Sequence, residues 1–168
     1  PYAAGIASEE AQHTIHQNPP WIWVGDTSRD QVVGVFFGLG AAYGLVDDEG
    51  VKKAIGDLAT RLTGCISRHQ WSPNDDISNT FLLRPEELQM LLQVTRHVDP
   101  TNTISGPFFV LPTKTAVLVD VQSTDSYFKF NLDYMTFYNL ARIQNNDDNL
   151  SAYKIVRNYT ATHQNPFF

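Results

Sequence analysis

Residues 21–48 read WIWVGDTSRDQVVGVFFGLGAAYGLVDD, in which a polar, acidic opening leads directly into an uncharged run from Gln31 to Val46. Ser28 and Gln31 have the spacing of a capping box, in which each side chain bonds the backbone N–H of the other residue. This spacing predicts a helix over 29–46. A helix that is apolar on every side is expected to be buried centrally. The polar residues at its start then face the end of a cavity, which favours a concave helical scaffold with a site at one end.

The segment that follows has the pattern of an outer helix. Its apolar face comprises Val51, Ala54, Ile55, Leu58, Ala59, Leu62, Cys65 and Ile66. Charged residues occupy the opposite face, so this helix is expected to be half exposed. Cys65, the single cysteine, is expected to be a small core residue. The acidic turn 47–50 joins the two helices into an inner–outer hairpin.

The same alternation returns toward the C-terminus. Residues 131–143 (NLDYMTFYNLARI) are almost entirely apolar and aromatic, which is typical of a second inner helix. After the turn at 145–149, an apolar stripe runs from Leu150 to Tyr159 and predicts a second outer helix. This is a second hairpin of the same kind.

A further helix is predicted between the two hairpins. Pro85 suits its first turn, and Asp99-Pro100 ends it. The long segments 68–84 and 101–128 are expected to be rim loops, and 115–121 within the second fits a short strand or a helical turn.

A short internal repeat also favours a periodic architecture. The sequence HQNP occurs at 16–19 and again at 163–166, each time after a helical pattern, at 8–15 and 150–162. With this repeat ending beside Phe167 and Phe168, we expect residues 1–168 to be a single helical domain that belongs to a longer chain or packs against another chain.

Composition excludes several classes of protein. The hydrophobic content of 42% argues against disorder, and the net charge of −6 leaves no basic surface for nucleic acid. The uncharged run is shorter than the ~20 residues that span a membrane. The five histidines lack ligand spacing and no glycine-rich phosphate loop is present, so neither a metal nor a cofactor is expected. No targeting segment indicates a compartment.

The alternation of apolar inner and amphipathic outer helices, with long loops at one rim, resembles the α/α-toroid or six-hairpin glycosidase group. GDTSRDQ at 25–31 with the helix after it, and FKFNLDYMTFYNLARIQNNDDN at 128–149, are similar to inner–outer hairpins of bacterial proteins of that kind. The resemblance implies an all-α fold, a partial toroid built of helical hairpins. This group includes glycoside hydrolases, polysaccharide lyases, sugar epimerases and terpene cyclases. Because the DxDD and repeated QW signatures of terpene cyclases are missing, a carbohydrate role is implied.

The first candidate site lies at the start of the helix over 29–46. Asp26 and Asp30 are four residues apart, which suits two carboxylates on one side of a cavity, as glycoside hydrolysis requires. Trp21 and Trp23 would form an apolar wall or stack on sugar rings, and Arg29 would bind a uronate or another anion. The alternative is structural: Asp26 caps the helix, Asp30 interacts favourably with the helix dipole, and both tryptophans belong to the core.

The second candidate site lies at the start of the other inner helix. Asp133 and Tyr134 would supply an acid or base, with Lys129 steadying a carboxylate. Their alternative roles are a first-turn acid and a core tyrosine. Asp75 and Asp76 are expected to be turn residues.

Two functions therefore remain open from the sequence. The first is a carbohydrate-active domain, a hydrolase, lyase or epimerase, that acts on a poly- or oligosaccharide. The second is a non-catalytic helical scaffold or binding module. Whether Asp26 and Asp30 face a cleft or only bond their own helix distinguishes the two.

Overall fold

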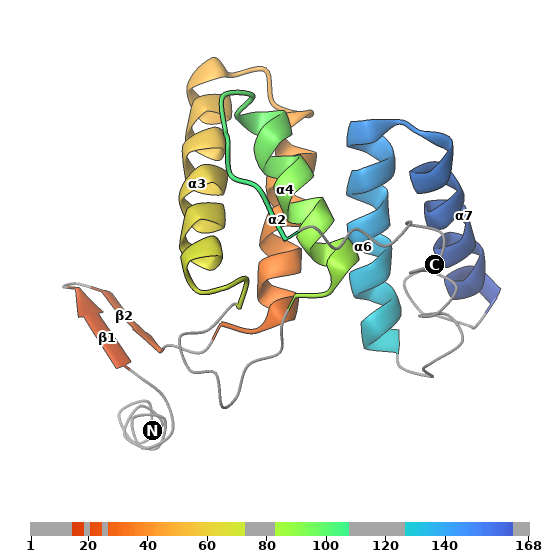
Figure 1. Ribbon diagram of the computed structural model, residues 1–168, viewed down its shortest axis with the longest axis horizontal. Helices are drawn as coiled ribbons and strands as arrows, with labels where there is room; N and C mark the ends of the chain where they lie inside the picture. The colour runs from red at the N-terminus through yellow and green to blue at the C-terminus, as the bar shows by residue number, and fades with distance from the viewer. Residues whose placement is uncertain (1–14, 19–20, 25–26, 73–82, 108–126, 163–168) are drawn as a thin grey trace.

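A computed structural model describes residues 15–18, 21–24, 27–72, 83–107 and 127–162. Five helices form the body, which confirms the predicted all-α class for it, and a short two-stranded ribbon precedes them (Figure 1). The elements are β1 (Ile15–Asn18), β2 (Trp21–Val24), α2 (Arg29–Tyr43), α3 (Glu49–Arg68), α4 (Pro85–Val98), α6 (Tyr127–Gln144) and α7 (Asp147–Thr162).

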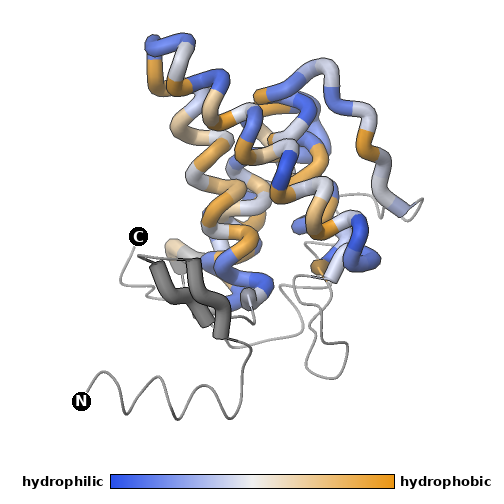
Figure 2. The backbone as a smooth tube through the Cα atoms, turned by 90° about the vertical axis from the view of Figure 1, so that its left-hand side faces the viewer, coloured by the Kyte–Doolittle hydropathy of each residue, from blue (hydrophilic) through white to orange (hydrophobic). Residues whose placement is uncertain are grey.

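Three helices make the centre of the body. α2, α4 and α6 run in the same direction, so all three begin at the same end, whereas α3 and α7 run the opposite way (Figure 1). Each of the three contacts the other two, α3 packs mainly on α4, and α7 packs on α6. Apolar and hydrophilic residues alternate along the helices (Figure 2), which allows each helix to bury one side. The largest fully buried apolar residues are Phe36, Phe137, Met90, Leu91, Leu140, Val33, Val94 and Val156.

The start of α2 is as the capping box predicts. The Gln31 N–H donates to Ser28 Oγ (3.4 Å), and the Ser28 N–H donates to Gln31 Oε1 (2.8 Å). The helix ends at Tyr43, three residues before the predicted end. The helix has no basic residue in its last turn, and Arg142 of α6 instead donates to the Ala41 carbonyl (3.4 Å). The positive charge of Arg142 thus interacts favourably with the negative, C-terminal end of the α2 dipole.

The prediction that α2 is buried on every side is wrong within the described residues. Val33 and Phe36 are buried, but Val35 is 45% exposed, and a Cβ added at Gly34 or Gly38 would meet nothing within 4 Å. An uncharged helix needs apolar neighbours only where it packs. Small side chains on its other side expose little apolar surface, so this side tolerates water.

Asn139 of α6 fixes the three central helices relative to one another. Its Nδ2 donates to the Phe36 carbonyl of α2 (3.2 Å) and contacts Met90 Sδ of α4 (3.8 Å). A Cβ at Gly40 would lie 2.8 Å from this same nitrogen, so glycine makes room for the amide. Since Asn139 is fully buried, the hydrogen bond is its main compensation for lost water.

The prediction that Cys65 is a core residue is also wrong, because Cys65 is exposed. α3 packs on α4 through a face rotated toward its small and polar residues. A Cβ at Gly56 would lie 2.9 Å from the Val98 carbonyl, and the Thr63 and Thr95 hydroxyls are 2.6 Å apart in the buried interface. This rotation leaves Val51, Leu58 and Cys65 on the solvent side.

The ribbon before α2 was not predicted. β1 and β2 are antiparallel, with Ile15 paired to Val24 and Asn18 to Trp21. Alternation along a strand puts positions 21 and 23 of β2 on the same face of the ribbon. The first copy of the HQNP repeat therefore lies partly in a strand; the second copy lies outside the described residues.

Candidate functional site

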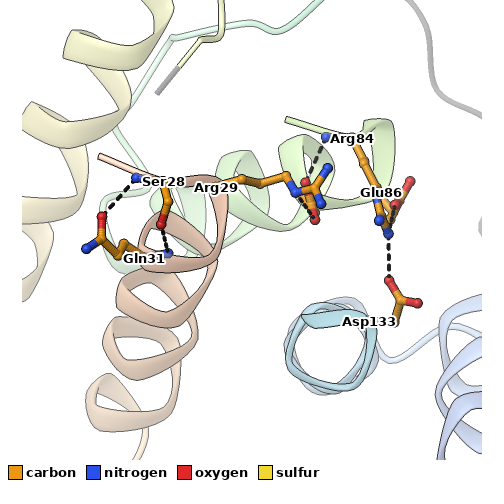
Figure 3. Close-up of polar contacts among 7 residues, drawn as sticks. Ser28, Arg29, Gln31, Arg84, Glu86 and Asp133 are labelled. Carbon is orange, nitrogen blue, oxygen red and sulfur yellow. Dashed lines mark hydrogen bonds and ion pairs between the residues drawn. The ribbon is translucent and has the colours of Figure 1, made fainter. Parts of the chain in front are cut away.

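Charged side chains from three helices meet where α2, α4 and α6 begin (Figure 3). We call this group the charged cluster; it comprises Arg29, Arg84, Glu86, Glu87 and Asp133. Two are cations and three are carboxylates. Parallel packing of the three helices brings the groups together, because each group stands in the first two turns of its helix or just before it.

Glu87 links α2 to α4. One carboxylate oxygen, Oε2, accepts a hydrogen bond from the backbone N–H of Arg84 (2.8 Å). The other, Oε1, lies 3.4 Å from Arg29 Nε. The Glu87 side chain is 0% exposed, so its charge depends on these contacts. A carboxylate in the first turn is also favoured by the helix dipole.

Arg84 links α4 to α6. Its Nη1 lies 3.3 Å from Asp133 Oδ1 and 3.9 Å from Glu86 Oε1 (Figure 3). The side chains of Asp133 and Glu86 are 1% and 4% exposed, against 21% for Arg84. Two buried carboxylates therefore share one guanidinium that reaches the surface. Pro85, at the first helical position, has a fixed φ that suits the start of α4 beside them.

Two further predicted residues lie at this end. Lys129 is buried and stands four residues before Asp133, so both are on one side of α6. Asp30 is half-buried in the first turn of α2. It is in helical register with Phe37, whose ring meets that of Tyr138 on α6 edge-on at 5.7 Å. Asp30 is therefore on the side of α2 that faces α6.

Tyr134 follows Asp133 in the sequence but faces another helix. Its hydroxyl oxygen is 3.2 Å from that of Tyr153 on α7, and their ring centroids are 5.5 Å apart. Burial raises the pKa of Tyr134 to about 12, and the hydrogen bond with Tyr153 adds to the rise. Tyr134 thus stays protonated at neutral pH and belongs to the contact between α6 and α7.

Other predicted site residues cannot be placed in the cluster. Asp26, Asp75 and Asp76 lie outside the described residues. For Trp21 and Trp23 only the strand backbone is described. A different tryptophan, Trp71, follows the end of α3 and packs against the core with φ of 65°. α3 ends at the end of the body where α2 begins (Figure 1).

Three residues of the cluster were missed from the sequence: Arg84, Glu86 and Glu87. Acids after a first-turn proline are ordinary at helix starts, so their pattern carries no special signal. The useful signal lies in the topology. Helices that alternate inner and outer place the starts of all inner helices at one end, and the residues at those starts are therefore neighbours.

Among the described residues, no group of three histidine, cysteine, aspartate or glutamate side chains is arranged to hold a metal ion. No helix in the described part of the chain is long and apolar enough to cross a membrane. Comparison with known proteins finds no matching family model, no matching curated protein and no matching solved structure.

Proposed function

We propose that the charged cluster is part of a carbohydrate-active site that acts on a poly- or oligosaccharide as a hydrolase, lyase or epimerase. The observation that carries this proposal is the pair of carboxylates, Glu86 and Asp133, that share Arg84. They come from two helices and are joined at a guanidinium that reaches the surface. Such a group contains an acid, a base and a cation in one place.

The upper limit on the distance between the two acids is compatible with this chemistry. Both carboxylates lie within 3.9 Å of Arg84 Nη1, so the nearest oxygens are less than about 8 Å apart. In glycoside hydrolases the two carboxyl groups are separated by roughly 5 to 9.5 Å. Asp30, half-buried in the first turn of α2, is the fourth acid of this end and is more exposed than the other three.

We also propose that these helices form part of an α/α toroid, and their arrangement supports this. α2 and α3 form one antiparallel hairpin and α6 and α7 another, and the three inner helices begin together (Figure 1). This is the inner–outer order that the resemblance implies. A closed ring would add further hairpins beside α2 or α6, and no described residue covers Gly38 of α2, while Val35 is 45% exposed.

A non-catalytic helical scaffold is the second candidate function. The contacts of Glu87 favour the scaffold, because one of its carboxylate oxygens caps α4 and the other pairs with Arg29. In that case the charged cluster holds three helices together and performs no chemistry. The two candidates differ in what a carboxylate-to-amide substitution does.

The test is a screen of neutral and uronic oligosaccharides for thermal stabilisation and turnover. Asp133→Asn, Glu86→Gln and Asp30→Asn are compared with Asp57→Asn, an exposed acid on α3. We expect turnover to fall by 10²-fold or more in at least one cluster variant that still folds, as for loss of a general acid or base. The control is expected to retain full turnover. If no saccharide binds or reacts, and the cluster variants only lose stability, the scaffold is the correct function.

A further inference from the structure

We infer that the ligand of this site is an acidic saccharide, and that Arg29 binds its carboxylate. The inference rests on the proposed function and adds the class of substrate to it. It starts from the unusual way in which Arg29 is held: a buried acid fixes one part of the guanidinium and leaves the rest without a partner among the described residues.

The contacts of Arg29 are one-sided. Nε is shielded from solvent and approaches Glu87 Oε1 at 3.4 Å without forming a hydrogen bond. The two terminal nitrogens make no hydrogen bond with any described residue, while the side chain keeps 24% of its surface exposed. Four N–H donors of the guanidinium are thus available at the surface.

A purely structural arginine would be held differently. An arginine that only neutralises Glu87 is expected to place two N–H groups on its two oxygens, the strongest arrangement for this pair. Here the backbone N–H of Arg84 donates to Glu87 Oε2 at 2.8 Å, so only Oε1 of Glu87 lies near Arg29. The fork of Arg29 is therefore oriented by Glu87 and left open for another planar anion.

The charges around Arg29 also favour an anion. The three carboxylates of the cluster are 0–4% exposed, whereas Arg29 and Arg84 are 24% and 21% exposed. Within the charged cluster, the two guanidinium groups therefore lie nearer to solvent than the three carboxylates. Arg29 is also the first residue of α2, where the helix dipole is positive. A carboxylate is the anionic group that saccharides with uronic residues carry.

The experiment compares ligands that differ only in charge. Binding of oligogalacturonate is measured by calorimetry against the same oligosaccharide with its carboxylates reduced to alcohols, and against inorganic sulfate. The first variant, Arg29→Lys, keeps the positive charge but loses the planar guanidinium. The second is the double variant Arg29→Met with Glu87→Gln, in which the acid that faces Arg29 is neutralised together with it. Arg61→Met is the matched control, because Arg61 contacts only the Asp57 carbonyl on exposed α3.

We expect the uronic ligand to bind at least tenfold more tightly than its neutral form. The double variant is expected to lose this preference, Arg29→Lys to lose part of it, and Arg61→Met to keep it. Equal binding of the neutral form would overturn the inference while the proposed function stands. Sulfate binding as tight as the uronic ligand would also overturn it, since the site would then take simple anions. No binding of either saccharide would contradict the inference and the proposed function together.

Discussion

The two sides of α6 hold their neighbours in different ways. The side toward α2 and α4 carries two polar groups that contact other helices: Asp133 contacts Arg84, and Asn139 contacts both α2 and α4. The side toward α7 carries a run of aromatic rings, in which Tyr134, Tyr138 and Tyr153 lie 5.5–6.3 Å apart. Neighbours in the sequence, Asp133 and Tyr134, therefore belong to different parts of the molecule.

The difference lies in how each contact responds to change. A buried polar group needs a specific partner. Loss of that partner leaves a charge or an amide whose desolvation is not compensated. An aromatic contact spreads its stabilisation over many atoms and tolerates small changes. Substitutions on the inner side of α6 are therefore expected to cost more than substitutions toward α7.

The largest effect is expected from Arg84→Met. This variant removes the guanidinium that both Asp133 and Glu86 contact while they remain buried, so the free energy of unfolding should fall by about 3 kcal/mol. Lys53→Met is the control, because its ion pair with Asp57 is exposed and contributes little to stability. Urea denaturation measures both. Equal, small losses would mean that the charged cluster contributes little to the fold.

A pair of glycine variants tests the Asn139 contact. Gly40→Ala puts a Cβ 2.8 Å from Asn139 Nδ2, and the resulting strain is expected to cost about 1–3 kcal/mol. Gly38→Ala, two residues away on the open side of α2, is expected to stabilise the protein by about 0.5–1 kcal/mol through helix propensity. Thermal unfolding of the two variants should shift in opposite directions. The same direction for both would refute the difference between the two sides of α2.

A small loss of stability is expected from Tyr134→Phe. It removes one hydrogen bond to Tyr153 and should cost about 1 kcal/mol near neutral pH. The raised pKa of Tyr134 favours the protonated form in the folded protein, so stability is expected to fall as the pH rises from about 10 to about 12. Tyrosinate absorbance and stability are measured across this range. A wild type and variant with the same pH dependence would exclude Tyr134 as its source.

Much of the fold follows from local signals. The capping box of Ser28 and Gln31 predicts the start of α2, and Pro85 predicts the start of α4. Both predictions agree with the structure because caps and prolines act within one turn. The face of α3 was misjudged at Cys65, because apolar spacing alone does not reveal that a glycine and a threonine make the contact with α4. Tertiary packing decides which part of a broad apolar face is used.

The candidate site was predicted only in part. Arg29 and Asp133 were named from the sequence and lie in the charged cluster. Lys129 is buried on the same side of α6 as Asp133, while Tyr134 lies against α7. Arg84 and its neighbours were missed, because their meaning depends on how three helices pack. A helix start is visible in a sequence; which starts meet is a property of the topology.

Asn139 gives the bundle a fixed register, and this has a consequence for folding. A slide of α6 by one turn, about 5.4 Å, would move its amide away from the Phe36 carbonyl and move Asp133 away from Arg84 at once. Slipped arrangements that bury similar apolar area therefore lose two polar contacts together. We therefore expect register errors of α6 to be disfavoured, and helix alignment to be coupled to assembly of the charged cluster.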